Sequence, residues 1–311
     1  TETKLHAIWQ SLLEVKEISI HDSFFQLGGH SLLATQLASR IQKQFNMQFQ
    51  LRDIFEQSSI AQMAQVIDGA QSGKAGTGEE EQITQRDGNK PAPLSFAQQR
   101  LLLLDQLEPN QATYNIPLAF KLDGRVNETA LQKTVDALYA RHDSLRTSFF
   151  YGEDEQPYQR VAEATHLPIN KVDFAELPQA EQAEKVHAWI DAEVERPFSL
   201  STGPLIRVSQ LRLAAEQHIM VIVMHHIIAD GWSVSVLFRE MAALYTAFVK
   251  ERPSPLPELP IQYTDFAAWQ RSWLQGDVLQ QQLDYWLDNL QDAPAVLTLP
   301  TDRPRPAVQS Y

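Results

Sequence analysis

Apolar residues recur at helical spacing through the first 70 positions of the chain. One amphipathic stripe runs through residues 5–13 and a second through residues 32–45, each with apolar positions three and four apart. Shorter helical patterns follow at residues 53–55 and 60–67. Residues 1–70 are therefore predicted to form a small all-α bundle of four helices, close to the lower size at which a core is self-sufficient.

The pattern changes between Gly69 and Pro93. This stretch is rich in Gly, Ser, Gln, Thr and charged residues, with three glutamates at positions 79–81 and few apolar side chains to bury. A segment of this composition is typical of a flexible linker, which we assign to residues 71–92. Such a tether lets a small domain move while it stays at high effective concentration near its neighbour.

Helix and strand patterns alternate in residues 93–311, which predicts an α/β (α+β) domain and makes the whole chain a multidomain protein. The predicted strands are residues 114–122, 148–151, 205–213 and 218–224. The predicted helices are residues 95–107, 128–141, 179–195, 233–250, 264–275 and 278–290. Ser95 can cap the first of these helices and Asn127 the second. The strand at 218–224 is almost entirely Val, Ile and Met, as expected for a strand that is buried on both faces.

Charge and composition exclude several functions. The chain has 26 basic and 39 acidic residues, a formal net charge of -13, and no cluster of Lys and Arg that would neutralise phosphates, so we expect no nucleic-acid partner. No run approaches the roughly 18 apolar residues of a membrane helix, and the first residues do not resemble a signal peptide. We therefore expect no membrane partner and a cytoplasmic location.

The sequence contains no cysteine. A disulfide framework, a thiolate metal site and an intrinsic thiol nucleophile are therefore excluded. Any thioester chemistry must use a sulfur from elsewhere.

A serine follows a glycine pair at the start of the second predicted helix. Gly28 and Gly29 permit backbone angles that are closed to other residues, so the loop can turn sharply and leave Ser31 at the helix N-terminus with its hydroxyl outward. Unpaired N–H groups and the positive end of the helix dipole favour an anion there, such as a phosphodiester. Position alone cannot separate this role from that of a simple N-cap, for which serine is among the commonest residues.

Two histidines end the apolar strand, and an aspartate and a glycine follow them. Because successive strand residues point to opposite faces, only one of His225 and His226 can readily line a given cleft. A histidine can accept and return a proton near neutral pH, while Asp230 either orients it or holds the loop through a cation. Gly231 lets its backbone N–H approach a developing oxyanion closely.

Three other interpretations of these residues stay open. The two histidines can be core side chains with satisfied hydrogen bonds. Asp230 can serve only to turn the chain before Gly231. A metal site is the third, but no third histidine or cysteine lies nearby to complete a zinc set, so no metal is predicted.

The string from Asp22 to Leu32, Asp-Ser-Phe-Phe-Gln-Leu-Gly-Gly-His-Ser-Leu, resembles the attachment motif of peptidyl carrier domains of nonribosomal peptide synthetases. The resemblance covers about residues 3–68. In that family the serine carries a phosphopantetheine arm whose thiol holds an aminoacyl or peptidyl thioester, which implies covalent attachment at Ser31. The resemblance thus supplies the missing sulfur and favours attachment over a cap.

The string from Met224 to Ser233, Met-His-His-Ile-Ile-Ala-Asp-Gly-Trp-Ser, is similar to the active-site motif of nonribosomal condensation domains. Other motifs of that family occur in order at residues 95–101, 141–149 and 263–270. The family implies a lobe like chloramphenicol acetyltransferase. Its members continue into a second lobe, so we expect residues 93–311 to hold the N-terminal lobe and the start of the second, with the C-terminal part absent.

The condensation family also implies roles for particular residues. Its second histidine is catalytic, which corresponds to His226, and its aspartate is mainly structural, which corresponds to Asp230. Arg141 or Arg146 is then the expected cation partner of that aspartate. The chain departs from the family at two positions. It has Ala229 where the family more often has serine, and Asp143 where the family often has glutamate. Neither change removes a catalytic group.

Together the two resemblances imply an amide-forming acyltransferase of nonribosomal peptide and antibiotic biosynthesis. The implied partners are an upstream adenylation domain, a downstream carrier domain, a phosphopantetheinyl transferase, and aminoacyl or peptidyl thioesters. Two alternatives remain: an epimerisation-type domain, and a catalytically silent module that docks carriers or recruits another protein. Epimerisation is disfavoured because His30, rather than aspartate, precedes Ser31 and because Gly-Trp-Ser follows Asp230.

Overall fold

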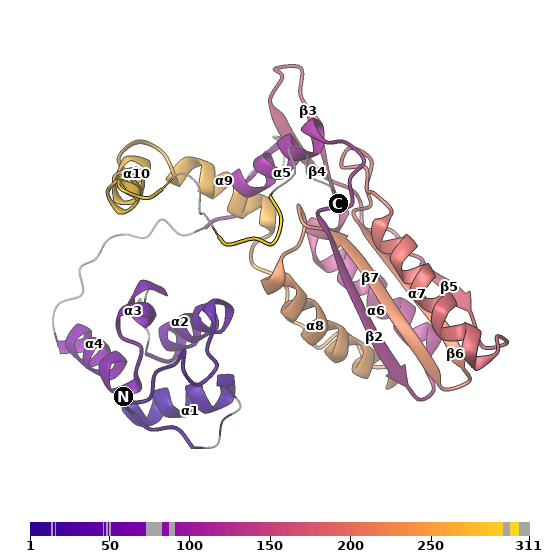
Figure 1. The fold of residues 1–311 in the computed structure, drawn as a ribbon, viewed down its shortest axis with the longest axis horizontal. Coiled ribbons are helices and arrows are strands. Elements are labelled where there is room, and N and C mark those ends of the chain that lie inside the picture. Colours follow the sequence, from indigo (N-terminus) through magenta and orange to yellow (C-terminus); the bar gives the residue numbers. More distant parts are fainter. Residues whose placement is uncertain are drawn as a thin grey trace.

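The computed structural model of the chain describes residues 1–13, 15, 17–45, 47, 49, 51–72, 83–86, 91–294 and 299–304. Two folded units occur within these ranges, a helical one at the N-terminus and a mixed α/β one after it (Figure 1).

The N-terminal unit consists of α1 (Glu2–Leu13), α2 (Ser31–Phe45), α3 (Leu51–Glu56) and α4 (Ile60–Ser72). Its core is formed by the apolar stripes of these helices and by the loop that precedes α2. The side chains with no exposed surface are Leu5, Trp9, Phe24, Ala34, Leu37, Ile41, Ile54, Ile60, Met63 and Ile67. The predicted four-helix bundle is confirmed.

Helix α4 continues to Ser72, beyond the end predicted at residue 67. It passes through Gly69, which a helix tolerates at a cost of about 1 kcal/mol relative to alanine. Most of the predicted linker, residues 73–82 and 87–90, lies outside the described residues.

A short part of the predicted linker lies against the second unit. The side-chain amide of Gln85 donates to the Pro260 carbonyl at 2.9 Å, and the Arg86 backbone N–H donates to Asp265 Oδ1 at 2.9 Å. Residues 83–86 are therefore attached to the surface of the second unit.

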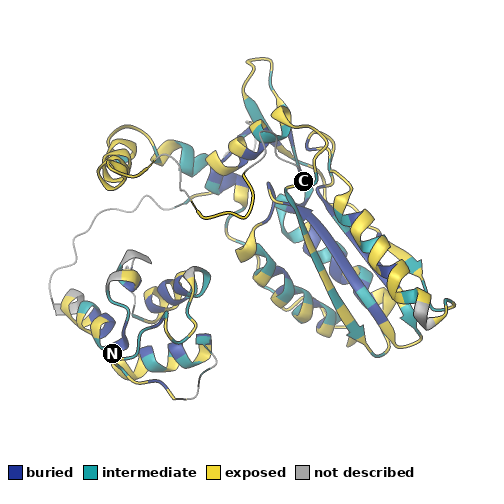
Figure 2. Cartoon of the chain, in the orientation of Figure 1, coloured by how far each residue is buried: buried dark blue, intermediate teal, exposed yellow. Residues whose placement is uncertain are grey.

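The second unit is built on a four-stranded sheet with the order β2-β7-β6-β5. Its strands are β2 (Asn115–Asp123), β7 (Gln217–His225), β6 (Ile206–Ala214) and β5 (Ile169–Asp173). The β5–β6 pair is parallel and the other two pairs are antiparallel. The central strand β7 is buried from Met220 to its end, as its apolar run predicts (Figure 2).

Helices cover both faces of this sheet because alternate β7 residues are apolar on each face. Met220, Ile222 and Met224 join the core beneath α6 (Glu128–Arg141) and α8 (Gly231–Val249). On the other face, the valines at 221 and 223 pack with side chains of α7 (Gln179–Glu195). This places the end of β7 between two helical layers.

A smaller three-stranded sheet has the order β1-β4-β3, formed by β1 (Ala92–Pro93), β4 (Pro157–Val161) and β3 (Thr147–Tyr151). Beside it runs α5 (Phe96–Leu107), which begins with the predicted Ser95 cap: the Gln98 N–H donates to Ser95 Oγ at 3.2 Å.

The chain then continues through α9 (Tyr263–Trp273) and α10 (Gly276–Leu290). Across the described ranges, every helix falls short of the length and apolar character that crossing a membrane requires.

Candidate functional site

The two histidines occupy the junction between β7 and α8. The His225 N–H donates to the Leu205 carbonyl at 3.0 Å, and the His226 N–H donates to the Tyr114 carbonyl at 2.8 Å. Strand β7 ends at His225 and His226 begins the turn that follows, so the first side chain is buried and the second is exposed. The structure therefore gives them different surroundings.

His225 is buried, with 3% of its surface exposed. Its Nδ1 accepts the Ile227 N–H at 3.1 Å, and the rings of Tyr114 and Phe198 lie with centroids 6.3 Å from its own. Burial, with a smaller contribution from His226, lowers the pKa of His225 from its ordinary value of 6.5 to about 4. At neutral pH the ring is uncharged, carries its proton on Nε2 and fixes the backbone that follows.

His226 is exposed and lines a cavity of about 180 Å³. The polar side chains around it come from four segments that are distant in sequence. These side chains are Gln98, Arg100, Ser144, Asp230, Ser233 and Tyr263. An imidazole in this position reaches both solvent and a polar recess. It is the histidine of the pair that can act on a bound substrate.

Asp230 is the N-cap of α8. Its Oδ1 accepts the Ser233 N–H at 2.8 Å and the Ser233 hydroxyl at 2.7 Å, and the Asp230 N–H donates back to Ser233 Oγ at 3.3 Å. This capping box starts the helix directly after the histidines and holds the loop in place. The expected structural role of Asp230 thus has a physical basis.

The expectation that Arg141 or Arg146 pairs with Asp230 is wrong, because each arginine has another partner among the described residues. Arg141 Nε lies 3.2 Å from Glu240 Oε2 and its Nη1 donates to the Pro257 carbonyl at 2.6 Å. Arg146 Nη2 instead pairs with Asp143 Oδ1 at 2.5 Å. Both arginines fasten the segment between α6 and β3, and neither contacts Asp230.

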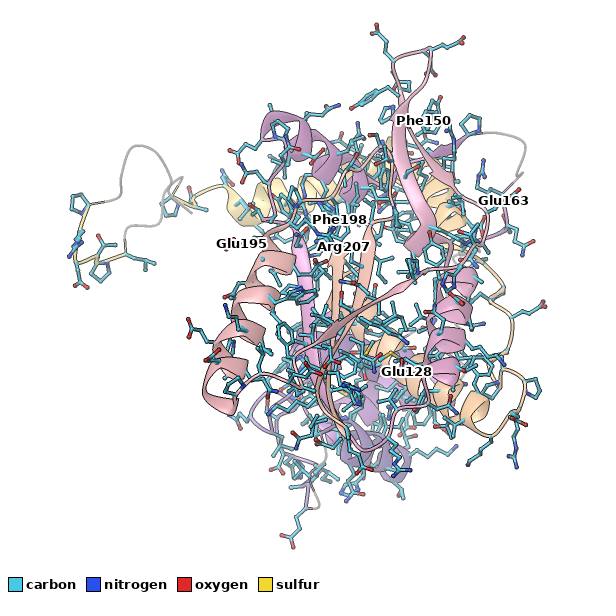
Figure 3. The ribbon with its side chains drawn as sticks, turned by 90° about the vertical axis from the view of Figure 1, so that its right-hand side faces the viewer. Glu128, Phe150, Glu163, Glu195, Phe198 and Arg207 are labelled. Atoms are coloured by element: carbon cyan, nitrogen blue, oxygen red, sulfur yellow. The ribbon has the colours of Figure 1, made fainter. Side chains whose placement is uncertain are left out.

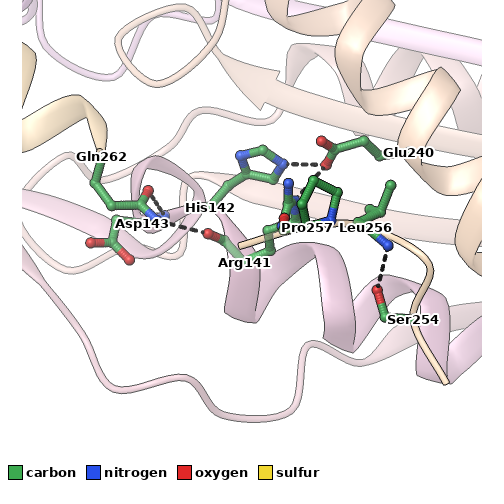
Figure 4. A network of polar contacts seen from close by, with 8 residues as sticks. All are labelled: Arg141, His142, Asp143, Glu240, Ser254, Leu256, Pro257 and Gln262. Carbon is green, nitrogen blue, oxygen red and sulfur yellow. Dashed lines mark hydrogen bonds and ion pairs between the residues drawn. The ribbon is translucent and has the colours of Figure 1, made fainter. Parts of the chain in front are cut away.

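The Arg141 ion pair belongs to a network of polar contacts around the buried carboxylate of Glu240 on α8 (Figure 4). His142 Nε2 lies 2.6 Å from the same Glu240 oxygen that Arg141 contacts. The Gln262 side chain accepts the Asp143 N–H at 3.2 Å and donates to the Arg141 carbonyl at 3.0 Å. The network ties α6, α8 and the segment before α9 together beside the cavity.

A second cavity of about 200 Å³ adjoins the first. The two share Ser144, Ile228, Ala229 and Ser233 in their linings. His142 and Trp232 also line this second cavity. The recess beside His226 therefore extends toward the Glu240 network.

Gly231 is the first residue of α8, where backbone N–H groups have no partner within the helix. It is exposed, it is not one of the described glycines with a positive φ, and a Cβ added to it would meet no atom within 4 Å. Gly231 is not among the residues that line either cavity, so its N–H as a donor to a developing oxyanion stays a prediction.

The glycine pair of the helical unit is required by its geometry. Gly28 has a φ of +96°, and a Cβ on Gly29 would overlap the Phe24 ring and lie 2.5 Å from the Phe24 carbonyl oxygen. The His30 carbonyl accepts the first helical hydrogen bond, from the Ala34 N–H at 2.8 Å. His30 therefore has the cap position and Ser31 is the first helical residue; the direction of its hydroxyl lies outside what the structure describes.

These observations fit a phosphopantetheine attachment site. The loop brings Ser31 to the N-terminus of a 15-residue helix, where the dipole favours a phosphodiester. The N-cap interpretation loses its support because the capping carbonyl belongs to His30.

Sequence reasoning missed several residues of the cavity. Arg100 and Tyr263 lie in the recognised motifs at 95–101 and 263–270, yet nothing in their spacing places them beside His226. Tyr263 Oη is 3.0 Å from Ser95 Oγ, and burial raises the pKa of its hydroxyl. Only the packing of α5 and α9 against the histidine loop brings these side chains together.

Comparison with known proteins agrees with this geometry. Residues 89–311 match the family described as Condensation domain, and residues 3–67 match the one described as Phosphopantetheine attachment site. The chain belongs to the condensation-domain family. It carries a phosphopantetheine carrier domain ahead of the condensation domain, so the predicted family and fold class are confirmed.

The chain is similar over its whole length to parts of very long proteins. It is 42% identical over 313 residues to tyrocidine synthase 2 of Brevibacillus parabrevis and 41% identical over 320 residues to malpinin synthetase of Mortierella alpina. All of this chain is covered in both cases, but only 8% and 4% of those proteins.

Two solved structures share the fold. The X-domain in its complex with OxyB from teicoplanin biosynthesis aligns with a TM-score of 0.64 at 27% identity, covering 75% of this chain and 50% of that one. The starter condensation domain of rhizomide synthetase aligns with a TM-score of 0.59 at 22% identity, covering 66% and 49%. The chain thus spans about half of these solved proteins.

Proposed function

We propose that this chain works in nonribosomal peptide synthesis, with Ser31 as the attachment residue of the carrier and the condensation domain as the catalyst of amide bond formation. The names of its relatives, which are peptide synthases and synthetases, support this class of reaction. The observation that carries the proposal is the contrast between an exposed His226 in a polar cavity and a buried, neutral His225.

In the proposed reaction, the amine of one carrier-bound amino acid attacks the thioester carbonyl of another acyl group. The C–N bond forms, the C–S bond breaks, and the thiol leaves. His226 takes the proton that the attacking nitrogen loses and returns it to the leaving sulfur, and the cavity holds the amine close to the carbonyl carbon. The N–H of Gly231 donates to the carbonyl oxygen as negative charge develops there.

The phosphopantetheine arm on Ser31 supplies the thiol, which a chain without cysteine lacks. Gly28 and Gly29 hold the turn that presents Ser31, and the α2 N-terminus stabilises the phosphodiester. Arg100 lines the same cavity as His226, and its cation would orient polar groups of the substrate there.

The wider setting follows from the same proposal. An upstream adenylation domain would load the carrier, a phosphopantetheinyl transferase would modify Ser31, and a downstream carrier domain would bring the acceptor amino acid. All of these steps belong to the cytoplasm.

Single-turnover transfer between loaded carriers tests the proposal. In a multidomain protein that includes this chain, intact-mass measurement should detect a dipeptidyl product on the downstream carrier. We expect His226→Ala to slow its formation by about 10²- to 10⁴-fold, the usual contribution of a positioned acid or base. Ser31→Ala should remove the mass added by a phosphopantetheinyl transferase, and an unchanged rate in His226→Ala would contradict the role of that residue.

A second candidate is a module that binds another protein without chemistry of its own. The solved X-domain, 27% identical to this chain, is described in a complex with OxyB, which favours recruitment as an alternative. The two functions separate in the same assay, because a recruiting module binds loaded carriers and forms no amide. Epimerisation would instead invert the α-carbon of a carrier-bound residue, which chiral analysis of the released amino acid detects.

A further inference from the structure

Behind His225, a buried ion pair lies under an aromatic ring. Arg207 of β6 and Glu193 near the end of α7 have side chains 15% and 10% exposed, with Arg207 Nε 2.5 Å from Glu193 Oε1. Arg207 Nη2 also donates to the carbonyls of Glu193 at 2.9 Å and Arg196 at 2.8 Å. The guanidinium is therefore held in one orientation by three acceptors.

Phe198 connects this ion pair to the histidine loop. The Arg207 guanidinium carbon lies 3.8 Å from the centroid of the Phe198 ring, and Figure 3 shows the two side chains next to each other. The Phe198 and His225 rings meet edge to face, with their planes at 86° and their centroids 6.3 Å apart. A cation above an aromatic face and an edge-to-face pair both have a preferred direction, unlike simple apolar contact.

His225 in turn controls the backbone of the loop. Its Nδ1 accepts the Ile227 N–H, and its carbonyl accepts the Ile228 N–H at 3.1 Å. These bonds shape the turn immediately after His226. A tilt of the His225 ring would weaken the bond to Ile227 and move the residue that faces the cavity.

We propose that Arg207 and Phe198 are positioning residues of the condensation site, which orient the His225 ring and thereby fix the backbone that presents His226. The inference rests on the proposed function of His226, but the contacts that carry it are independent of substrate. Burial lowers the pKa of Arg207 and the Glu193 carboxylate opposes that effect, so the carboxylate keeps the cation available for stacking.

The condensation domain contains a matched control. Arg160 stacks over Phe150 with its guanidinium carbon 4.4 Å from the ring centroid, on the small sheet. Phe150 lines a cavity together with Phe198, but its described ring contact is with Tyr158 and not with His225. Phe150→Leu and Arg160→Gln remove the same type of contact as Phe198→Leu and Arg207→Gln. A purely structural role predicts similar effects of both sets on the histidine loop.

The test is NMR on the full chain, with the His225 and His226 ring signals assigned through His225→Gln and His226→Gln. In Phe198→Leu and Arg207→Gln, we expect the Ile227 amide to exchange about 5- to 30-fold faster, the range that a desolvated cation–π contact is worth. The His226 ring signals should shift in the same variants. Phe150→Leu and Arg160→Gln should leave both readouts unchanged, and Phe198→Tyr should restore them.

Exchange of the Ile227 amide within about twofold of wild type in Phe198→Leu, or an equal change in Phe150→Leu, would overturn the inference. If Arg207→Gln fails to fold, Arg207→Lys replaces it, because lysine keeps the charge near Glu193 but has no plane to stack on Phe198. Arg207→Lys must then speed Ile227 exchange. Failure of the proposed function is distinguishable, because it leaves these NMR results intact while His226→Ala has no effect on amide formation.

Discussion

At the scale of single residues, the site depends on keeping one histidine uncharged. His225 is neutral because burial lowers its pKa to about 4, and its Nδ1 is then free to accept the Ile227 N–H. Protonation would place a hydrogen on that nitrogen and break the bond. The state of a residue that faces away from the cavity thus decides the geometry of the one that faces it.

This arrangement predicts a loss of stability in mild acid. The unfolded chain protonates His225 below about pH 6.5, whereas the folded chain does so only near pH 4. The unfolded state therefore binds more protons as the pH falls through this window, and the folded state loses up to about 3 kcal/mol. Denaturant unfolding of wild type and His225→Gln between pH 7 and pH 4 measures this loss. Equal slopes of the free energy of unfolding against pH in both proteins would contradict it.

Gly231 offers a second test at this scale. Proline is well tolerated at the first helical position, and Asp230 before it is extended, with a φ of -144° and a ψ of -176°, outside the α region that a following proline disfavours. Gly231→Pro therefore removes the N–H while keeping the helix start, and should lower the rate of amide formation by about 10²- to 10³-fold. Gly231→Ala keeps the N–H and should react as wild type; a fully active proline variant would exclude this donor.

At the scale of elements, the start of α8 determines where the loop ends. Asp230 closes a capping box with Ser233, and Asn127 caps α6 with its side chain alone, which accepts the Ala130 N–H at 3.0 Å. The contribution of each cap to stability can be measured by substituting the capping residue. Only the first adjoins His226.

We expect Asp230→Ala to lower the free energy of unfolding by about 1 kcal/mol and Asp230→Asn to recover most of it, because the amide oxygen can still accept the Ser233 N–H. Asn127→Ala should cost a similar amount of stability. Chemical denaturation checks both, and the rate of amide formation should fall in Asp230→Ala alone. If Asp230→Asn were as unstable as Asp230→Ala, its charge rather than its cap would hold the loop.

Elements with a strong pattern could be predicted from the sequence, and weakly patterned ones could not. The apolar run of β7 and the caps of α5 and α6 gave their positions within one or two residues. The strands β1, β4 and β5 could not be predicted because each has only two to five residues. Half of these residues are exposed or proline, so the strands show no clear alternation of apolar and polar positions. The sheets pair them through backbone contacts that only the fold supplies.

The candidate site divides in the same way. Opposite faces for His225 and His226 follow from strand geometry alone, so the sequence could separate them. The partner of Arg141 could not be found, because Glu240 lies 99 positions away on the inward face of α8 and no local signal connects the two. Arg100 and Tyr263 enter the cavity for the same long-range reason.

At the scale of the whole molecule, α10 differs from the other helices of the condensation domain. None of its residues is buried among the described part of the chain, although it carries an apolar stripe at helical spacing (Figure 2). The exposed apolar side chains of the stripe are Leu279, Leu283, Trp286, Leu287 and Leu290, and Tyr285 is exposed beside them. A contiguous apolar surface of this kind favours association with another apolar surface.

We therefore expect this chain to self-associate through α10 as its concentration rises. Sedimentation velocity should detect dimers or larger species, and Leu283→Glu with Leu287→Glu should shift the distribution toward monomer, because two carboxylates on the stripe cannot be desolvated cheaply. Gln281→Glu with Gln282→Glu, which adds the same charge to α10 without removing an apolar side chain of that stripe, is the control for charge repulsion. A wild-type chain that stays monomeric at high concentration would show that the α10 stripe does not drive association. An equal shift toward monomer in the control pair would assign the effect to net charge instead.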